Sequence, residues 1–311
     1  MIRKFVLLLL LIGAVFSLHA FNPGYSGFIV RANGLDIPYH LFTVFVLPGE
    51  TIDLSVNDHN GKPFDIGYSE GKLIREGDYH WKYIAPSSKG NHILTLGSSP
   101  AGTGMVLNVF VMVPASGQKG EYLNGYRIGK YPDKLFRNNP AYKKPEGFIE
   151  VTKENKELQI SPHFFLKQFL CKQQPGQWPK YMVLNPKLII KLELLLEKLN
   201  KNGLHINSLF VMSGYRSPYY NSSLGRGIYS RHIYGDAADI YVDTNNDKVI
   251  DDLNRDGKAS MEDAVFLGNI IESMDKDPKY NHLIGGLGKY KKTSAHTWDI
   301  HVDTRGYKAR W

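Results

Sequence analysis

Three short segments in the C-terminal half of the chain combine the residue types that bind catalytic metal ions. They begin at Ser213, Ser230 and His296 and read SGYRSP, SRHIYGDAAD and HTWDIHVD. A catalytic zinc ion takes three protein ligands from histidine nitrogen and carboxylate oxygen, and it leaves its fourth position to water. His232, Asp239 and His301 can supply that set, although a lone histidine near an apolar run is more often a core or surface residue. The three residues together make a zinc site the first hypothesis.

The same segments resemble the family of zinc D-Ala-D-Ala carboxypeptidases and murein endopeptidases, to which the hedgehog-type fold is related. The likeness extends from Ser161 to Trp311 and includes the closing residues HVDTRG. It implies that His232, Asp239 and His301 bind zinc and that the protein hydrolyses peptide bonds in the peptidoglycan stem. Zinc lowers the pKa of its bound water to about 7 and polarises the scissile carbonyl.

A general base must accept the proton of the attacking water and then return it to the leaving amine. The candidates are His296 and Asp299. Many members of the resembled family carry an acid three residues before the last histidine ligand, where this chain has Trp298, but one branch carries a histidine that matches His296. On a strand, Asp299 and His301 would point to the same face, so Asp299 can also reach the site. The choice between the two stays open, and either side chain can instead hydrogen-bond a loop.

Three further residues of these segments have a substrate-binding or supporting interpretation. Arg216 resembles the family arginine that holds the substrate and stabilises the developing oxyanion, a role that suits a permanently charged guanidinium. A surface turn residue paired with an acid is the alternative. Ser230 either contacts the substrate or caps its loop. Asp303 can orient the imidazole of His301, or it forms a structural ion pair with Arg305 or Arg310.

A second ion site is predicted between the second and third segments. Residues 252–263 place oxygen-bearing side chains at loop positions 1, 3, 5, 9 and 12 and glycine at position 6, which is the spacing of a loop that wraps Ca²⁺. The stretch resembles a dockerin or EF-hand loop, with Asp at position 12 where an EF-hand has Glu. The expected ligands are the side chains of Asp252, Asn254, Asp256, Ser260 and Asp263 and the carbonyl oxygen of Lys258.

Residues 243–263 hold seven acidic and three basic residues. Carboxylates at this density repel one another, which favours a bound cation; a solvated acidic loop made of turns is the alternative. Asp243, Asn245 and Asp247 repeat the 1-3-5 spacing, but Lys248 stands where glycine is needed. They therefore either complete the same site or form a half-site. We expect calcium to pin this insertion beside the zinc cleft.

The elements that position these residues are predicted as an α+β zinc peptidase domain over residues 159–311. Ser161-Pro162 is typical of a helix start and predicts a helix over residues 163–171. Asn185-Pro186 precedes a stripe of leucines that ends near Gly203, which predicts a second helix. Strands are expected at residues 209–212, 237–242 and 300–304, and a further helix at 261–274.

The first half of the chain has a different pattern. From residue 21 to 114, short β-rich runs are separated by Gly, Pro, Asn and Ser, which predicts an antiparallel, immunoglobulin-like β-sandwich without catalytic residues. The runs lie at residues 40–46, 51–56, 80–84, 92–96 and 106–113. Residues 115–158 are rich in Gly, Pro, Lys and Tyr without a sustained period, and we expect a linker that partly wraps a neighbouring domain.

The first twenty residues predict a secretory signal peptide. Arg3 and Lys4 precede an apolar run from Phe5 to Phe16, and Ala20 is the small residue at the expected cleavage point. The run is shorter than the ~20 residues needed to cross a bilayer, so we expect no stable membrane span. Cleavage would remove two positive charges and lower the net charge from +8 to +6.

Composition limits the remaining possibilities. The chain has 311 residues, of which 42% are hydrophobic and 22% charged, which excludes a disordered or collagen-like protein. Its single cysteine, Cys171, cannot close an internal disulfide, so the core or bound metals must stabilise the fold. The small basic excess does not by itself indicate nucleic acid, which we do not expect as a partner, and it fits an anionic cell wall.

The leading hypothesis is a periplasmic or secreted zinc peptidase associated with the cell wall, which the β-sandwich positions on peptidoglycan. One competitor is a wall-binding module that keeps the zinc but has lost catalysis, which the departure at Trp298 allows. Another is a metallopeptidase or amidase with a different substrate. Carboxypeptidase and endopeptidase activity, the ligand of the sandwich and the oligomeric state all stay open.

Overall fold

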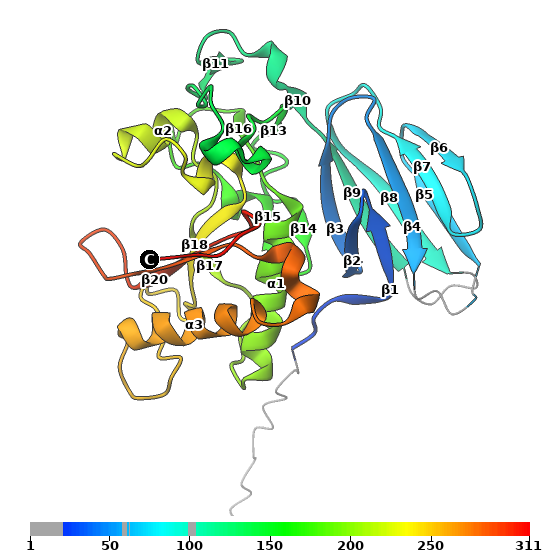
Figure 1. The fold of residues 1–311 in the computed structure, drawn as a ribbon. Coiled ribbons are helices and arrows are strands. Elements are labelled where there is room, and N and C mark those ends of the chain that lie inside the picture. The colour runs from blue at the N-terminus through cyan, green and yellow to red at the C-terminus, as the bar shows by residue number, and fades with distance from the viewer. Residues whose placement is uncertain (1–20, 58–60, 62, 99–103) are drawn as a thin grey trace, which may run out of the picture.

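The computed structural model describes residues 21–311 except 58–60, 62 and 99–103, and it is rich in β-strands, with three α-helices in the described part (Figure 1). The predicted signal peptide, residues 1–20, lies outside the described residues. None of the helices described has the length and apolar character needed to cross a membrane.

Residues 25–111 form two β-sheets with alternating buried and exposed positions. In β4 (Thr51–Asn57), Ile52, Leu54 and Val56 are buried while the terminal residues are exposed, which is the period of two that one buried face requires. The other strands are β1 (Tyr25–Ala32), β2 (Leu35–Tyr39), β3 (Leu41–Val46), β5 (Phe64–Tyr68), β6 (Lys72–Arg75), β7 (His80–Ile84), β8 (Gly90–Ser98) and β9 (Gly104–Val111). The strand orders are β2-β1-β4-β7-β6 and β3-β9-β8-β5.

Each of the five β-rich runs predicted from the sequence contains a strand, but the expectation of a wholly antiparallel arrangement was wrong. Strands β3 and β9 pair in parallel, from Leu41 opposite Val106 to Val46 opposite Val111. Because β4 to β8 separate them along the chain, no tight turn forces them to run in opposite directions. Strands β1, β2, β5 and β6 were not predicted. The last two are short and mostly exposed, so they carry little apolar periodicity.

Residues 115–158, expected to be a linker, pack against the C-terminal part. Strand β13 (Gly147–Val151) pairs with β10 (Val113–Pro114) and β16 (Lys180–Met182), and β11 (Tyr122–Leu123) pairs with β12 (Tyr126–Arg127). Short 3-10 turns lie at Ala115–Gly117, Phe136–Asn138 and Pro140–Tyr142. Tyr131 and Tyr142 of this segment form a buried cluster with Ile233 and Tyr234. The segment therefore covers the region next to the candidate ligand His232.

A five-stranded sheet carries two of the candidate metal ligands. Its order is β17-β18-β20-β19-β21, and the pairs are antiparallel except β19 with β21. The bounds are β17 (Phe210–Ser213), β18 (Ala237–Tyr241), β19 (Gly286–Tyr290), β20 (Asp299–Asp303) and β21 (Ala309–Arg310). The three strands predicted here are confirmed to within one residue at each end, whereas β19 and β21 were not predicted.

Three helices accompany this sheet: α1 (Pro186–Lys201), α2 (Pro218–Ser223) and α3 (Met261–Met274). Helix α1 begins as predicted, because the Asn185 side chain accepts a hydrogen bond of 2.9 Å from the backbone of Lys187. Its leucine stripe is buried. The predicted helix at residues 261–274 is also confirmed, and the Ser260 hydroxyl caps it.

The helix predicted over residues 163–171 is wrong. Instead, β14 (Gln159–Ser161) and β15 (Phe164–Phe165) pair around Pro162-His163, and a 3-10 helix, Leu166–Phe169, follows. The reason is a tertiary contact. The Glu193 carboxylate on α1 accepts hydrogen bonds from the His163 backbone at 2.9 Å and lies 2.7 Å from its ring nitrogen. This contact fixes His163 at the tip of the turn.

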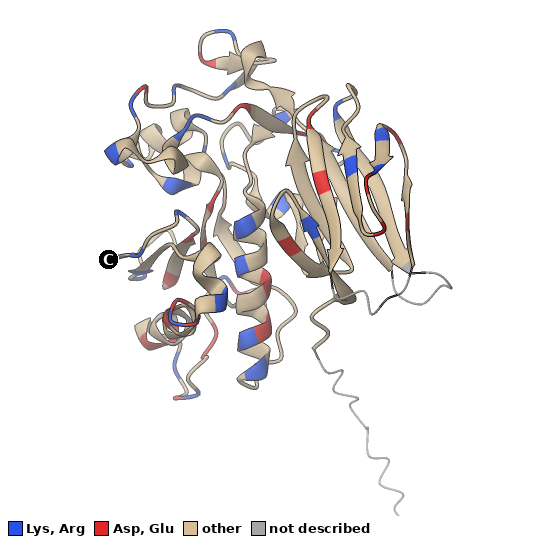
Figure 2. Cartoon of the chain, turned by 45° about the vertical axis from the view of Figure 1, so that its right-hand side comes forward, with Lys and Arg blue, Asp and Glu red and all other residues tan. Residues whose placement is uncertain are grey.

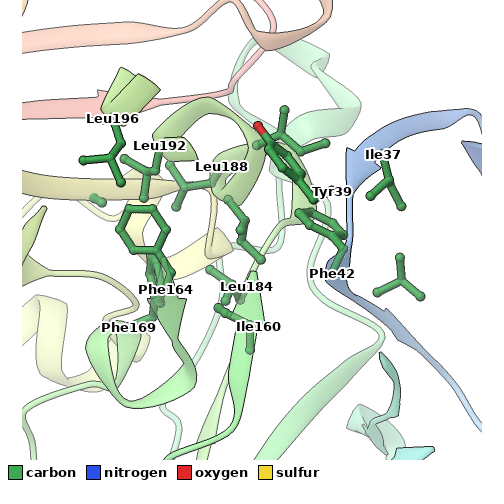
Figure 3. Close-up of a cluster of buried hydrophobic side chains, with 14 of the residues drawn as sticks. Ile37, Tyr39, Phe42, Ile160, Phe164, Phe169, Leu184, Leu188, Leu192 and Leu196 are labelled. Atoms are coloured by element: carbon green, nitrogen blue, oxygen red, sulfur yellow. The ribbon is translucent and has the colours of Figure 1, made fainter. Parts of the chain in front are cut away.

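One hydrophobic core connects the N-terminal sheets to the C-terminal part. Tyr39 of β2 and Phe42 of β3 are buried in the same cluster as Leu188 of α1 (Figure 3). The labelled neighbours in that view include Ile37, Ile160, Phe164, Phe169, Leu184, Leu192 and Leu196. A polar contact crosses the same boundary, because the Tyr25 hydroxyl donates to Glu197 at 2.5 Å. The core thus holds both parts in one arrangement.

Candidate metal centre

Strand register places two of the candidate ligands opposite each other. Asp239 on β18 is paired with His301 on β20, and on its other side with Ser213 on β17. Directly opposed residues on one face have Cβ atoms about 4.5–5.5 Å apart, so these side chains converge. The pairing of β18 with β20 therefore joins two sequence segments that are 62 residues apart.

His232 reaches the same point from a turn. The 3-10 helix Arg231–Tyr234 ends at Gly235, whose φ is +70°. A Cβ at Gly235 would lie 2.3 Å from the carbonyl oxygen of Val183, so only glycine allows this close approach. The ring of His232 is fixed by its Nδ1, which lies 2.7 Å from the carbonyl oxygen of Gly214.

Three potential ligand atoms meet at this point. His301 Nδ1 lies 2.9 Å from Asp239 Oδ1, and His232 Nε2 lies 3.2 Å from each of them. The second nitrogen of each ring faces an oxygen: His232 Nδ1 faces Gly214, and His301 Nε2 lies 3.0 Å from Asp303 Oδ2. Neutral rings would donate there and turn their lone pairs toward the Asp239 carboxylate. A cation satisfies all three acceptors, and a set of two histidines and one carboxylate suits zinc.

Burial and mutual contacts set the ionisation of these groups, which are 2–4% exposed. Burial lowers the pKa of His232. Burial opposes ionisation of Asp239, but the charges and hydrogen bonds of His232 and His301 hold its pKa well below the usual range. Burial also opposes the charge on His301, yet hydrogen bonds to Asp239 and Asp303 raise its pKa to about 9. Metal binding must therefore displace a proton from His301. Across the described residues, no other His, Cys, Asp or Glu side chains form such a group of three.

Asp303 supports His301 and also forms an ion pair. Its Oδ2 faces His301 Nε2, and both of its oxygens accept from Arg305 Nε at 2.9 Å. Both roles left open by the sequence are therefore present, whereas Arg310 pairs with acids on and after α3. Buried Lys191 of α1 donates to the carbonyl oxygen of Asp303 at 3.0 Å. Helix α1 thus holds the end of β20.

Arg231, beside the candidate ligand His232, is a buried residue that sequence reasoning missed. Its Nε donates to Asp236 at 3.0 Å and its Nη2 at 2.5 Å, while Nη1 donates to the carbonyl oxygen of Ala141 at 3.0 Å. The guanidinium also lies 4.3 Å from the ring centre of Tyr142. Residues 115–158 therefore brace the turn that carries His232.

The three candidate ligands line a pocket of about 590 Å³, and both candidates for the general base line it with them. His296 Nδ1 lies 2.7 Å from the carbonyl oxygen of Thr297 and 3.0 Å from Asp299 Oδ1. Donation of Nδ1–H to Thr297 leaves His296 Nε2 as an acceptor. Asp299 is fully buried; its 3.0 Å contact with His296 is an ion-pair contact without regular hydrogen-bond geometry, so its two carboxylate oxygens have no hydrogen-bond partner among the described residues. Burial, with the nearby charge of Asp239, raises its pKa to about 7.

The two expected substrate-binding residues also line this pocket. Arg216 donates from Nε to Ser213 Oγ at 2.8 Å and pairs through Nη2 with the second oxygen of Asp239. This holds its positive charge beside the metal ligands. Ser230 precedes the 3-10 helix, but its side chain makes no capping hydrogen bond there, which leaves the hydroxyl for a substrate.

Sequence reasoning missed the aromatic wall of the pocket. The Trp311 ring lies 5.1 Å from the His301 ring, and its Nε1 donates to Tyr290 at 2.8 Å. Gly288 is paired with His301, and a Cβ there would lie 2.4 Å from Trp311 Nε1. Trp311 and Tyr290 belong to none of the three motifs, so no spacing signal indicated them.

The acidic insertion forms two turns of similar hydrogen bonding. In the first, the backbone of Asp247 and of Lys248 donates to Asp243. In the second, Asp256 and Gly257 donate to Asp252 in the same way. Of the other expected calcium ligands, Asn254, Lys258 and Ser260 lie along the loop leading into α3, and Asp263 lies in the first turn of that helix.

Asp263 does not face a common centre with the other acids. Its side chain accepts from the backbone of Leu253 at 2.7 Å and of Ser260 at 2.7 Å, and so joins the loop to α3. Within the described part of the chain, the loop carboxylates form no three-residue metal group. The calcium site therefore stays a prediction.

Comparison with known proteins identifies the region that contains the site. No curated protein matches the chain. An endo-fucoidan hydrolase of glycoside hydrolase family 107 is 16% identical over 24% of this chain and 13% of its own, with a TM-score of 0.21. A nucleoside hydrolase-related hypothetical protein from Saccharophagus degradans is 14% identical over 27% of this chain and 25% of its own, with a TM-score of 0.20. The chain thus spans a quarter or less of these structures.

A family model matches a longer and more informative stretch. Residues 162–266 match the model for peptidase M15. The matched stretch includes Arg216, His232 and Asp239, while His301 lies beyond it. This segment of the chain is therefore similar to the peptidase M15 family.

Proposed function

We propose that the protein is a periplasmic or secreted zinc metallopeptidase that hydrolyses stem or cross-link peptides of peptidoglycan. The observation that carries this proposal is the convergence of His232, Asp239 and His301 in a pocket that also holds a proton-transfer pair. The M15 match supports a peptidase, and the resemblance of the three motifs to murein peptidases supports the peptidoglycan substrate.

Each of the pocket residues named above has a separate role in the proposed peptide hydrolysis. A zinc ion held by the three ligands supplies Lewis acidity and a water of lowered pKa. His296 Nε2 takes the proton of the attacking water and delivers it to the leaving amine, with Asp299 beside its other nitrogen. Arg216 offers positive charge to the developing oxyanion from a position fixed by Ser213.

The alternative is a zinc-containing module that binds the cell wall without hydrolysis. Its support from the sequence is Trp298, which replaces the acid that many relatives have three residues before the last ligand. The 3.0 Å contact between His296 and Asp299 in the same pocket supports a proton-transfer role for this pair. This observation favours an enzyme.

Digestion of purified sacculi tests the proposal. The wild type should contain zinc and release fragments that mass spectrometry identifies, which also shows whether a terminal D-Ala or a cross-link is cut. His232→Ala should lose both zinc and fragment release, whereas the exposed His205→Ala should keep both. Full activity in His232→Ala contradicts a zinc peptidase. Binding to sacculi without any products from the wild type supports the non-catalytic alternative.

Two further parts of the proposal concern the rest of the chain. We propose that the N-terminal sheets form a sandwich domain that positions the α+β peptidase domain on the wall. We also propose that Ca²⁺ binds residues 252–263 and stabilises the insertion. If a calcium-selective chelator leaves the melting temperature and the protease sensitivity of this loop unchanged while zinc is retained, the calcium proposal is wrong.

A further inference from the structure

A second hollow adjoins the metal pocket along strand β17. It has a volume of about 660 Å³ and is lined mainly by residues 208–212 and 214 and by residues 167, 168 and 170–172, together with Pro175, Lys180, Asp243 and Asn246. We call it the β17 groove. Lys172 and Met212 line both this groove and the metal pocket, so the two hollows are neighbours. A substrate longer than the metal pocket can therefore extend into the groove.

The groove runs beside an open strand edge. β17 is the end strand of its sheet and pairs only with β18. For Phe210, Val211 and Met212, the described residues provide no backbone partner outside the sheet, whereas further along Tyr215 donates to the carbonyl oxygen of Phe169. An unpaired strand edge presents N–H and C=O groups that an extended peptide can hydrogen-bond.

Basic residues outnumber acidic ones in the lining of both hollows; the β17 groove is lined by Lys167, Lys172 and Lys180 and by Asp243. The metal pocket is lined by four arginines and two lysines but only two aspartates. Three of the arginines are paired with aspartates: Arg216 with Asp239, Arg231 with Asp236 and Arg305 with Asp303. Elsewhere, positions of both signs are scattered over the two parts of the chain (Figure 2).

Lys172 lines both hollows, so its ammonium group can contact a substrate that extends from one into the other. It is exposed, and among the described residues no carboxylate pairs with it. An ammonium group with free donors at the mouth of a peptide groove suits a carboxylate of the bound chain.

We propose that the β17 groove binds, as an extended chain, the part of an acidic peptide substrate that lies away from the scissile bond, and that Lys172 binds a carboxylate of that part. This inference rests on the proposed peptidase function and adds the substrate class to it. It makes Lys172 and the β17 edge determinants of specificity for long acidic peptides.

Three synthetic peptides test the proposal with the zinc-loaded full chain. The first is the short acetyl-L-Lys-D-Ala-D-Ala. The second is L-Ala-γ-D-Glu-L-Lys-D-Ala-D-Ala, which adds two residues and a free carboxylate, and the third is its amide at that carboxylate. The wild type should have the highest kcat/KM for the second peptide, by about tenfold over the amide, because only the free carboxylate can pair with the Lys172 ammonium group; tenfold corresponds to about 1.4 kcal/mol.

Variants at position 172 identify the contact. Lys172→Gln should remove the preference for the acid over its amide, and Lys172→Glu should reverse it. Lys187→Gln is the matched control, because Lys187 is an exposed lysine at the start of α1 that lines neither hollow. It should keep the wild-type preference.

The possible results distinguish failure of the groove proposal from failure of the proposed peptidase function. If the wild type cleaves all three peptides with equal kcat/KM, or Lys172→Glu keeps the wild-type preference, the groove proposal is overturned and the peptidase stands. If the wild type cleaves none of them and releases nothing from sacculi, both proposals are overturned.

Discussion

His296 and Asp299 line the pocket beside the candidate metal ligands, and we propose them as its proton-transfer groups. His296 Nδ1 lies 3.0 Å from Asp299 Oδ1. The His296 side chain is partly exposed in the pocket, whereas the Asp299 side chain is buried. Replacing His296 with Ala should lower kcat by about 10²- to 10⁴-fold, the usual loss for a general base, with little change in KM. Asp299→Asn should cause a smaller loss, because Thr297 still orients the ring.

Steady-state kinetics on the peptide that the wild type cleaves best measure both variants. The exposed His80→Ala, on β7, is the control and should behave like the wild type. If Asp299→Asn loses far more activity than His296→Ala, then Asp299 is the base and His296 its support.

Asp303 contacts His301 and not the metal position, so its replacement should change metal affinity. Asp303→Asn keeps the size of the side chain but removes the negative charge that holds the His301 ring. Loss of such a supporting carboxylate typically lowers metal affinity 10- to 100-fold. Competition with a zinc chelator measures the affinity, and circular dichroism checks that the variant is folded.

Asp36→Asn is the matched control for this change. Asp36 also pairs with an arginine, Arg31, but on the exposed surface of β1 and β2. Its zinc affinity should equal that of the wild type. Equal affinity in Asp303→Asn would contradict the supporting role.

The pocket residues that could be predicted from the sequence were those whose spacing within one segment forms a pattern. Residues that reach the pocket through contacts between distant segments could not be predicted. His232 and Asp239 were found because a turn and a strand place them together within one motif. Lys172 and Trp311 lie in the same pocket but come from segments that carry no metal-binding pattern. Their positions depend on how the chain packs, which a single sequence does not display.

Among the elements, α1 and β20 are joined by a buried lysine. Lys191 donates to the carbonyl oxygens of Leu283 and Asp303 at 3.1 and 3.0 Å. Burial, reinforced by Arg310, lowers the pKa of Lys191 despite nearby carboxylates such as Asp275. The folded protein therefore loses this proton at a lower pH than the unfolded chain, whose lysine titrates near 10.4.

This shift predicts a pH dependence of stability with a definite sign. Between the two pKa values the unfolded chain binds more protons, so the free energy of unfolding should rise with pH, by at most about 1.4 kcal/mol per pH unit. Lys191→Met removes this contribution. Urea unfolding at several pH values up to about 10 should show the wild type gaining stability relative to Lys191→Met as pH rises. A difference that stays constant or shrinks with pH would contradict the lowered pKa.

Helix signals in the sequence were reliable where local and tertiary preferences agreed. Asn185-Pro186 and Ser260 start helices because the cap, the apolar stripe and the packing favour the same structure. Ser161-Pro162 has the same local chemistry, but Glu193 from α1 binds the following residue and holds a strand turn there. That partner lies 30 residues away, beyond the reach of a local pattern.

At the scale of the whole molecule, length and composition predicted two domains, and the packing adds that they share a core. Tyr39 and Phe42 are buried together with Leu188 across the boundary. Shared apolar burial couples the stability of the two parts, since opening one exposes the surface of the other. The sequence shows where the strand-rich pattern gives way to a helix-rich one, but it does not show that the two parts pack against each other.

The shared core predicts that zinc stabilises strands far from the metal centre. A ligand that binds only the folded state raises the unfolding free energy by about 4 kcal/mol at 1,000 times its Kd. If the two parts unfold together, this gain protects backbone amides of β9 as well as those of β18 and β20. Hydrogen exchange measured with excess zinc and with chelator should therefore show slower exchange with zinc in all three strands.

His232→Ala, which lacks a ligand, is the control and should show no difference between zinc and chelator. Protection confined to β18 and β20 would mean that the N-terminal sheets open independently, and that the core around Phe42 does not couple them to the peptidase. Protection that includes β9 would mean that the sheets proposed to bind the wall and the metal centre unfold as one unit, because the contacts of Tyr39 and Phe42 with the C-terminal part are lost only when both open.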